Sequence, residues 1–169
     1  MSVSLWRIGT TQGKYRADDL SGAGAASVGG RYNGLGTAVV YTSVNVALTV
    51  LETVVHFGVG AKAHSNKYLI EIEVPDNVFA ARMTMDIAQL KAAGYPFWDA
   101  IPFALHGQPV GDQWVAAGAS LLLELPSAVA PHAGVPDRNV LINPAHADFH
   151  RIKIVRTERF IYDPRIATP

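Results

Sequence analysis

The chain has 169 residues, of which 49% are hydrophobic and 17% charged, so it is long and apolar enough to bury a substantial core. Fourteen basic side chains balance fourteen acidic ones, which excludes the general attraction to nucleic acid or anionic lipid that a strongly basic chain would have. The chain has no cysteine, which excludes disulfides, thiolate metal sites and cysteine nucleophiles.

The N-terminal segment predicts where the protein works. Its first residues enter a strand-like pattern at once, without the basic segment, apolar stretch and cleavage site of a secretory signal peptide. No apolar run approaches the roughly 20 residues of a membrane-spanning helix. We therefore expect a cytoplasmic protein that forms a single domain over residues 1–169 and binds neither a membrane nor nucleic acid directly.

The first half of the chain predicts two strands and a helix, with a glycine-rich loop between the strands. In chain order these are a strand at 4–8, a loop at 9–36, a strand at 38–42 and a helix at 44–57. Ser43 is the expected N-cap of the helix, and Gly58 is expected just after its last residue. A polar loop of this length inside a compact domain is usually functional, and its glycines allow a ligand to approach the backbone closely.

The second half of the chain predicts short strands that alternate irregularly with short helices. Strands are expected at 68–74, 120–125, 139–142 and 151–155, helices at 85–93 and 107–117, a helical turn at 144–149 and a final edge element at 160–169. Residues 98–106 fit no single state. Strands without regular intervening helices predict an α+β fold rather than a doubly wound parallel sheet.

Several common catalytic motifs are absent from the sequence. It has no phosphate-binding loop of the Gly-x-x-x-x-Gly-Lys type and no Gly-x-Ser-x-Gly element, and its segment at 22–24 lacks the third glycine of a dinucleotide fingerprint. His146 and His150 have the i, i+4 spacing of metal ligands but no third ligand nearby, so we expect no metal site. These absences disfavour zinc chemistry and acyl transfer.

Two candidate functional residues lie in loops. Arg31 stands in the glycine-rich loop, and its guanidinium offers a planar set of donors that suits phosphate or carboxylate. A solvated surface arginine would fit the same pattern. Ser127 follows the predicted strand at 120–125, at a place where scaffolds display functional groups, although serine after a proline is also ordinary turn chemistry.

Glu52 is the third candidate. It is the only acidic residue of the predicted helix at 44–57, its neighbours are apolar, and His56 lies four residues further on the same face. If it is buried on so apolar a helix, this carboxylate needs a hydrogen-bonding partner or has a catalytic role. On the solvent-exposed side of the helix it would need neither. These residues alone leave both a functional and a surface glutamate open.

The order of the segments resembles the RES-domain family, which is named after an Arg, a Glu and a Ser that correspond here to Arg31, Glu52 and Ser127. The similarity covers nearly the whole chain, and its specificity comes from the order and spacing of many short motifs. They are Leu5-Trp6-Arg7-Ile8, Ser21-Gly22-x-Gly24-Ala25, Gly29-Gly30-Arg31-Tyr32-Asn33-x-x-Gly36-Thr37, Val40-Tyr41-Thr42-Ser43, Leu51-Glu52, His56, Val74-Pro75, Gly111-Asp112, Val129, Asn139-x-Leu141-x-Asn143-Pro144-x-His146, Phe149 and Phe160-x-Tyr162-Asp163-x-Arg165.

The resemblance implies an ADP-ribosyltransferase-like fold, in which a β-sandwich core flanked by short helices holds NAD in a cleft. It also implies the toxin of a bacterial toxin–antitoxin pair, with NAD as substrate and no separate cofactor. The implied partner is an Xre-like antitoxin that blocks the active site, and a homodimer within a larger complex is expected. Activities known in the family are hydrolysis or phosphorolysis of NAD, and protein ADP-ribosylation for some members.

The chemistry of NAD fits a single glutamate. Nicotinamide in NAD is already a cationic leaving group, so its departure needs no general acid, and one carboxylate can stabilise the oxocarbenium-like ribose. Ordinary glycosidases use two carboxylates because their leaving groups are poorer. A chain with one candidate glutamate and no obvious acidic partner therefore suits NAD better than a sugar polymer.

Each candidate residue has an expected role in this chemistry. Glu52 would stabilise the ribose, and Arg31 would bind the pyrophosphate. The other expected roles are enclosure of the nicotinamide by Tyr32 and Tyr41, orientation of the ribose or of Glu52 by Ser127, and bracing of loops by Asn139 and Asn143. Arg7 is a secondary candidate for a phosphate contact, and a structural role at the end of a strand fits it equally well.

Two other functions remain open. The same pocket could pass ADP-ribose to a protein, in which case a modified protein appears instead of free ADP-ribose or its 1″-phosphate. A non-catalytic module would bind a nucleotide or a partner without turnover, and the joint presence of Arg31, Glu52 and Ser127 disfavours it.

Overall fold

The computed structural model describes residues 1–166 except 14, 57–65, 102–105 and 131–136. Its elements are β1 Ser2–Thr10, α1 Ala23–Val28, β2 Val40–Ser43, α2 Val46–Val54, β3 Lys67–Pro75, α3 Asp76–Ala80, β4 Met83–Thr84, α4 Ile87–Ala92, α5 Gln108–Ala117, β5 Leu122–Pro126, β6 Arg138–Ile142, the 3-10 helix η1 Ala147–Arg151 and β7 Lys153–Arg159. None of the helices in these ranges is long and apolar enough to cross a membrane.

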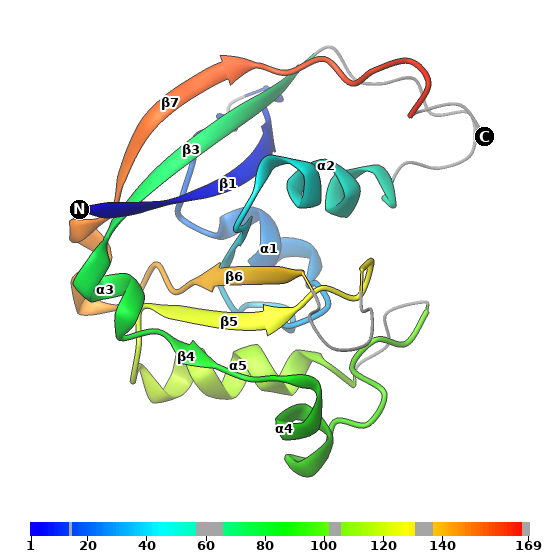
Figure 1. Cartoon of the computed structure of the whole chain (residues 1–169), viewed down its shortest axis with the longest axis vertical. Helices are drawn as coiled ribbons and strands as arrows, with labels where there is room; N and C mark the ends of the chain where they lie inside the picture. The colour runs from blue at the N-terminus through cyan, green and yellow to red at the C-terminus, as the bar shows by residue number, and fades with distance from the viewer. Residues whose placement is uncertain (14, 57–65, 102–105, 131–136, 167–169) are drawn as a thin grey trace.

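The strands form one seven-stranded sheet in the order β4-β5-β6-β2-β1-β3-β7. β1 pairs with β3 along its full length, but it meets β2 at a single residue pair, Trp6 with Ser43. The sheet is therefore divided at this pair into an upper half-sheet of β1, β3 and β7 and a lower half-sheet of β2, β6, β5 and β4, with α2 beside the gap (Figure 1). All neighbouring strands are antiparallel except β4 and β5.

Hydrophobic clusters cover both faces of the lower half-sheet, because successive side chains of a strand point to opposite faces. Leu122 of β5 belongs to a cluster that includes Ile72 of the upper half-sheet, so the two half-sheets pack against each other. Leu123 belongs to a second cluster with Leu90 of α4 and Trp114 of α5, the helices that lie below β5 in Figure 1. This arrangement confirms the α+β class and the sandwich-like core flanked by short helices.

The strand–turn–helix at β2 and α2 is present, but its cap differs from the expectation. Asn45 is the N-cap, and its side chain accepts a hydrogen bond from the Leu48 N–H at 2.8 Å. Ser43 belongs to β2 and uses its hydroxyl elsewhere, so the predicted cap was wrong. The helix runs from Val46 to Val54, while residue 57 and Gly58 lie outside the described part of the chain.

Three further features differ from the predicted elements. The expected loop at 9–36 contains α1, which the sequence pattern does not predict because its glycine and alanine residues show no amphipathic period. The elements α3 and β4 are too short to produce a pattern. The final edge strand is β7, and residues 160–166 form no strand.

Candidate active site

A cleft of about 600 Å³ opens where the two half-sheets separate beyond the pair of Trp6 and Ser43. Its walls come from β1, α1 and the segment after it, β2, α2, the segment after β5, and Asn139 of β6. Arg7, Arg31, Tyr41 and Glu52 all line this cleft, although they stand far apart in the sequence. The structure thus brings most of the candidate residues together.

Strand register explains why one cluster of polar side chains forms at the cleft. β6 is antiparallel to both β2 and β5, so the start of β6 lies beside the ends of its two neighbours. Asn139 pairs with Ser43 on one side and with Leu125 on the other, and Ser127 follows β5 directly. α2 starts shortly after β2, which carries Glu52 to the same place.

Glu52 is held through one of its two carboxylate oxygens. The Ser127 hydroxyl donates to Oε1 at 2.7 Å, and the Asn139 side-chain amide donates to the same atom. Ser127 Oγ accepts two backbone N–H bonds, from Val129 at 3.1 Å and Ala130 at 3.2 Å. Ser127 is fully buried and Glu52 half-buried, so the serine contacts the glutamate from the protein interior.

Asn139 was expected to brace a loop, and its contact with Glu52 was missed. Its amide oxygen accepts a hydrogen bond from the Ser43 hydroxyl at 2.8 Å. One feature of the sequence pointed to a functional role for Asn139, because this residue belongs to the motif of the family resemblance that also includes Asn143. Asn143 does brace a loop, since its Oδ1 accepts the N–H of Ala145 at 3.0 Å.

Arg31 is held by backbone carbonyls. Its Nη1 donates to the carbonyl oxygens of Trp98 at 3.0 Å and Ala100 at 3.1 Å. Helix α5 supports this segment from below, because a Cβ at Gly111 would lie 1.8 Å from the carbonyl oxygen of Tyr32. Only glycine allows so close an approach of the helix to the backbone of the Arg31 segment.

The two tyrosines of the cleft have different environments. Tyr32 lines the cleft but is only 2% exposed, and its hydroxyl donates to the Pro126 carbonyl at 3.1 Å, so the fold leaves little of its ring for the expected contact with nicotinamide. Tyr41 is half-buried; its hydroxyl accepts the Tyr32 N–H and donates to Asn33 at 2.7 Å. Burial raises the pKa of both phenols well above the ordinary value, which keeps them protonated.

Arg7 stands on β1, next to Trp6, and lines the cleft. Its Nη1 donates to the backbone carbonyl of Asp19 at 3.1 Å. Burial lowers the pKa of this guanidinium, and the negative charge of Asp19 acts in the opposite direction. The half-buried Arg7 is thus a second cation in the cleft, beside Arg31.

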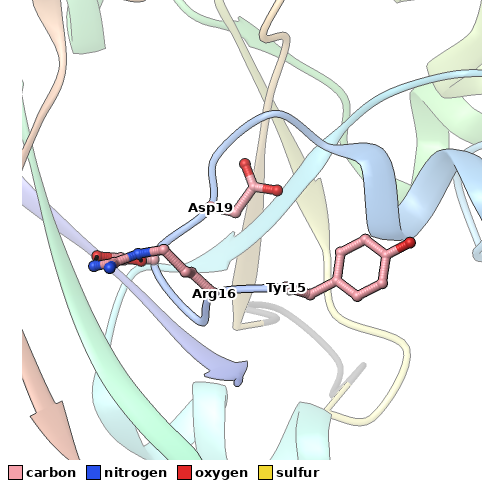
Figure 2. A pocket seen from close by; sticks show the side chains of 4 residues that line it. Tyr15, Arg16 and Asp19 are labelled. Atoms are coloured by element: carbon pink, nitrogen blue, oxygen red, sulfur yellow. Dashed lines mark hydrogen bonds and ion pairs between the residues drawn. The ribbon is translucent and has the colours of Figure 1, made fainter. Parts of the chain in front are cut away.

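A second hollow lies on the surface at residues 15–19, and it has a different character. In Figure 2 the side chains of Tyr15, Arg16 and Asp19 point in different directions. Arg16 forms an exposed ion pair with Asp18 at 2.8 Å, which contributes little to stability in water. No group of side chains converges there on a common point.

The two histidines with ligand spacing take part in local structure. His146 Nδ1 accepts the Asp148 N–H at 3.1 Å at the start of η1, and His150 Nδ1 lies 2.7 Å from the Ala147 carbonyl oxygen. Among the residues that the structure describes, no group of three or more His, Cys, Asp or Glu side chains could hold a metal ion.

Comparisons with known proteins identify the family of the chain. The model of the RES domain family matches residues 4–163. "Prs ADP-ribosylating toxin" of Sphingobium sp. (strain YBL2) is 43% identical over 166 residues, which cover 98% of each chain. "Toxin Res" of Photorhabdus laumondii subsp. laumondii is 32% identical over 163 residues, which cover 96% of each chain.

A solved structure shares the fold. It is described as the crystal structure of the M. tuberculosis MbcT-MbcA toxin-antitoxin complex, and it aligns with a TM-score of 0.65 and 16% identity over 95% of this chain and 85% of that one. The family model matches nearly the whole chain, and two toxins are 43% and 32% identical to it. The chain belongs to the RES-domain family of toxins.

Proposed function

We propose that the protein breaks the bond between nicotinamide and ribose in NAD and thereby acts as a toxin. The observation that carries the proposal is the way in which Glu52 is hydrogen-bonded. Two donors fix its Oε1, whereas no hydrogen bond from the described residues reaches its Oε2, and the side chain lines the cleft. A carboxylate held in this way is suited to stabilising a positive charge that develops beside it.

The bond breaks as the electron pair moves to the nicotinamide nitrogen, which was already cationic and leaves as a neutral molecule. Positive charge then develops on the ribose C1″ and its ring oxygen, and Glu52 offsets it. Water attacks C1″ and loses a proton, which gives ADP-ribose, or phosphate attacks and gives ADP-ribose 1″-phosphate. This scheme needs one carboxylate beside the ribose, and Glu52 supplies it. The other acidic residue that lines the cleft, Asp19, accepts hydrogen bonds from Ser21 through both of its carboxylate oxygens.

The other candidate residues divide into two groups in this proposal. Arg31 and Arg7 bind the pyrophosphate as the two cations of the cleft, and Tyr41 lies against the nicotinamide end. Ser127 is fully buried, and Tyr32 lines the cleft with only 2% of its surface exposed, so we expect neither to make the main contacts with NAD. Ser127 positions Glu52, and Tyr32 supports the turn before Ser127 through its bond to Pro126.

The proposal includes an antitoxin partner and a place of action. The structural neighbour described above is a toxin–antitoxin complex, which supports a partner protein for this chain. We expect the partner to be an Xre-like antitoxin that covers the cleft, because a toxin that consumes NAD must be kept inactive. NAD is a cytoplasmic metabolite, so the cytoplasm is the expected location.

A second candidate function is transfer of ADP-ribose to a protein. The relative at 43% identity is named an ADP-ribosylating toxin that acts on Prs, which favours this alternative. Both candidates use the same bond cleavage and the same glutamate, and they differ only in the group that attacks C1″. A protein acceptor would approach through the open mouth of the cleft.

Product analysis tests the proposal and separates the candidates. Purified protein is incubated with NAD alone, with phosphate, and with a bacterial lysate, and the products are identified by mass spectrometry. Free nicotinamide with ADP-ribose or its 1″-phosphate supports NAD degradation, and a protein heavier by one ADP-ribose supports transfer. NAD that binds without release of nicotinamide in any arm would show that both candidates are wrong.

A further inference from the structure

Glu52 stands at the end of a chain of hydrogen bonds that begins at Ser43. The Ser43 hydroxyl donates to Asn139 Oδ1 at 2.8 Å, and Asn139 Nδ2 donates to Glu52 Oε1. Ser43 is 3% exposed and Asn139 is 9% exposed, so water competes little for these contacts. The three residues come from β2, β6 and α2, and the register of β2 and β6 places Ser43 opposite Asn139.

The direction of each hydrogen bond follows from the chemistry of the groups. An ionised carboxylate only accepts hydrogen bonds, so the Asn139 atom that faces Oε1 must be the amide nitrogen. The amide oxygen then faces Ser43, whose single hydroxyl proton satisfies it. With the amide turned round, two oxygens would face each other at Glu52, a buried arrangement without a hydrogen bond.

The direction of the second hydrogen bond to Glu52, from Ser127, follows from the same kind of argument. Ser127 Oγ accepts backbone N–H groups from Val129 and Ala130, which occupy both of its acceptor positions. Its one proton is therefore left for Glu52 Oε1. The Ser127 hydroxyl and the Asn139 amide both donate to Oε1, and Oε2 is the atom left for a ligand in the cleft.

We propose that Asn139 and Ser43 are positioning residues for the reaction: Ser43 fixes the orientation of the Asn139 amide, and that amide, with Ser127, fixes Glu52 so that Oε2 meets the ribose. This inference rests on the proposed NAD cleavage and extends it to two residues outside the Arg, Glu and Ser of the family name. Neither residue carries out bond breaking. Each acts through the geometry of Glu52.

Two substitutions test the proposal by kinetics. Asn139→Asp keeps the shape of the side chain but replaces the donor with an acceptor, so kcat falls about 10- to 100-fold while the KM for NAD stays close to that of the wild type. Ser43→Ala removes only the fixing of the amide, and kcat falls about fivefold. A purely structural role would lower the melting temperature and leave kcat per folded molecule unchanged.

Matched controls exist for both substitutions. Asn143→Asp also places a carboxyl group at a buried asparagine just beyond β6, but this residue bonds Ala145 instead of Glu52. Ser120→Ala removes a buried serine hydroxyl that bonds Trp114 and Leu122. Both controls keep the wild-type kcat of the folded protein, even where they lower its stability.

A second measurement does not depend on activity. In the NMR spectrum of the protein labelled with 15N, the Asn139 side-chain amide moves in Glu52→Gln and in Ser43→Ala, and it stays in place in Ser120→Ala. An Asn139 amide that is unmoved by Glu52→Gln, or a wild-type kcat in Asn139→Asp, overturns the proposal. If the wild type releases no nicotinamide, the proposed function fails, and the NMR result still decides whether Ser43 and Asn139 hold Glu52.

Discussion

The cleft has two walls that are held in different ways. In the Glu52 wall, which consists of Glu52, Ser127 and Asn139, side chains bond side chains at the ends of β5 and β6. In the Arg31 wall, which consists of residues 29–34 and the backbone at Trp98 and Ala100, a guanidinium bonds carbonyl oxygens of a neighbouring segment. One wall is fixed by the sheet and the other by contacts between loops.

This difference agrees with the two tasks that a nucleotide-cleaving site must perform. Stabilising a developing charge requires a group that does not reorganise during the reaction, and strand ends provide that rigidity. Binding a pyrophosphate requires donors that exchange one partner for another, which a guanidinium held by neutral carbonyls can do. We therefore expect changes to the Glu52 wall to act on kcat and changes to the Arg31 wall to act on KM.

The largest expected effect comes from the Glu52 wall. Glu52→Gln keeps the size of the side chain and removes its charge, so kcat for nicotinamide release falls by on the order of 100-fold or more, with little change in KM. Steady-state kinetics on the folded variant measure this loss. Full NAD consumption by folded Glu52→Gln would remove the basis of the proposed mechanism.

The next effect tests the Arg31 wall. Arg31→Ala removes charge-assisted hydrogen bonds to phosphate, so the KM for NAD rises about 10- to 100-fold with a smaller change in kcat. Arg16→Ala is the control, because this exposed arginine lies in the surface hollow of Figure 2 and leaves both constants unchanged. A kcat loss in Arg31→Ala as large as that of Glu52→Gln would show that the two walls do not differ in task.

A smaller effect is expected from the helix behind the Arg31 wall. A methyl group at Gly111 would overlap the Tyr32 carbonyl, so Gly111→Ala displaces the segment or the helix and destabilises the protein by about 1–3 kcal/mol. The KM for NAD rises with the displacement of Arg31. Gln113→Ala, at an exposed position of the same helix, keeps the wild-type KM and unfolding free energy.

The smallest effect concerns the tyrosines between the walls. Burial raises the pKa of Tyr32 and Tyr41 in the folded state, so above about pH 10 the unfolded chain releases phenol protons that the folded chain keeps. Stability is thus complete below pH 10 and falls as the pH rises, by up to about 1.4 kcal/mol per pH unit for each tyrosine. Urea unfolding between pH 8 and 11 measures this slope, which is shallower in Tyr41→Phe; equal slopes would contradict the assignment.

The sequence predicted most of the strands because their apolar residues alternate or run together, as in the segments that became β3 and β5. It could not predict α1, whose residues are nearly all Gly, Ala or Ser and leave no periodic pattern. The N-cap was placed at Ser43 because Ser and Asn are equally good caps, and only the pairing with β6 shows that the Ser43 hydroxyl is taken by Asn139.

The sequence named most of the residues that the structure gathers at the cleft, but not the contacts between them. The bond between Asn139 and Glu52 joins residues 87 positions apart, and that between Ser127 and Glu52 joins residues 75 apart. Such contacts depend on the order of the strands in the sheet, and a local sequence pattern does not predict that order. For the same reason the sequence did not show that Tyr32, although it lines the cleft, is buried in the cluster beside α5.

The single pair of Trp6 and Ser43 gives one residue two tasks. Ser43 is the only residue of β2 that β1 pairs with, and it is also the first donor of the chain that leads to Glu52. The pairing that joins the half-sheets and the hydrogen bonds that orient the carboxylate therefore share one residue, so the architecture of the sheet and the geometry of the glutamate are constrained together.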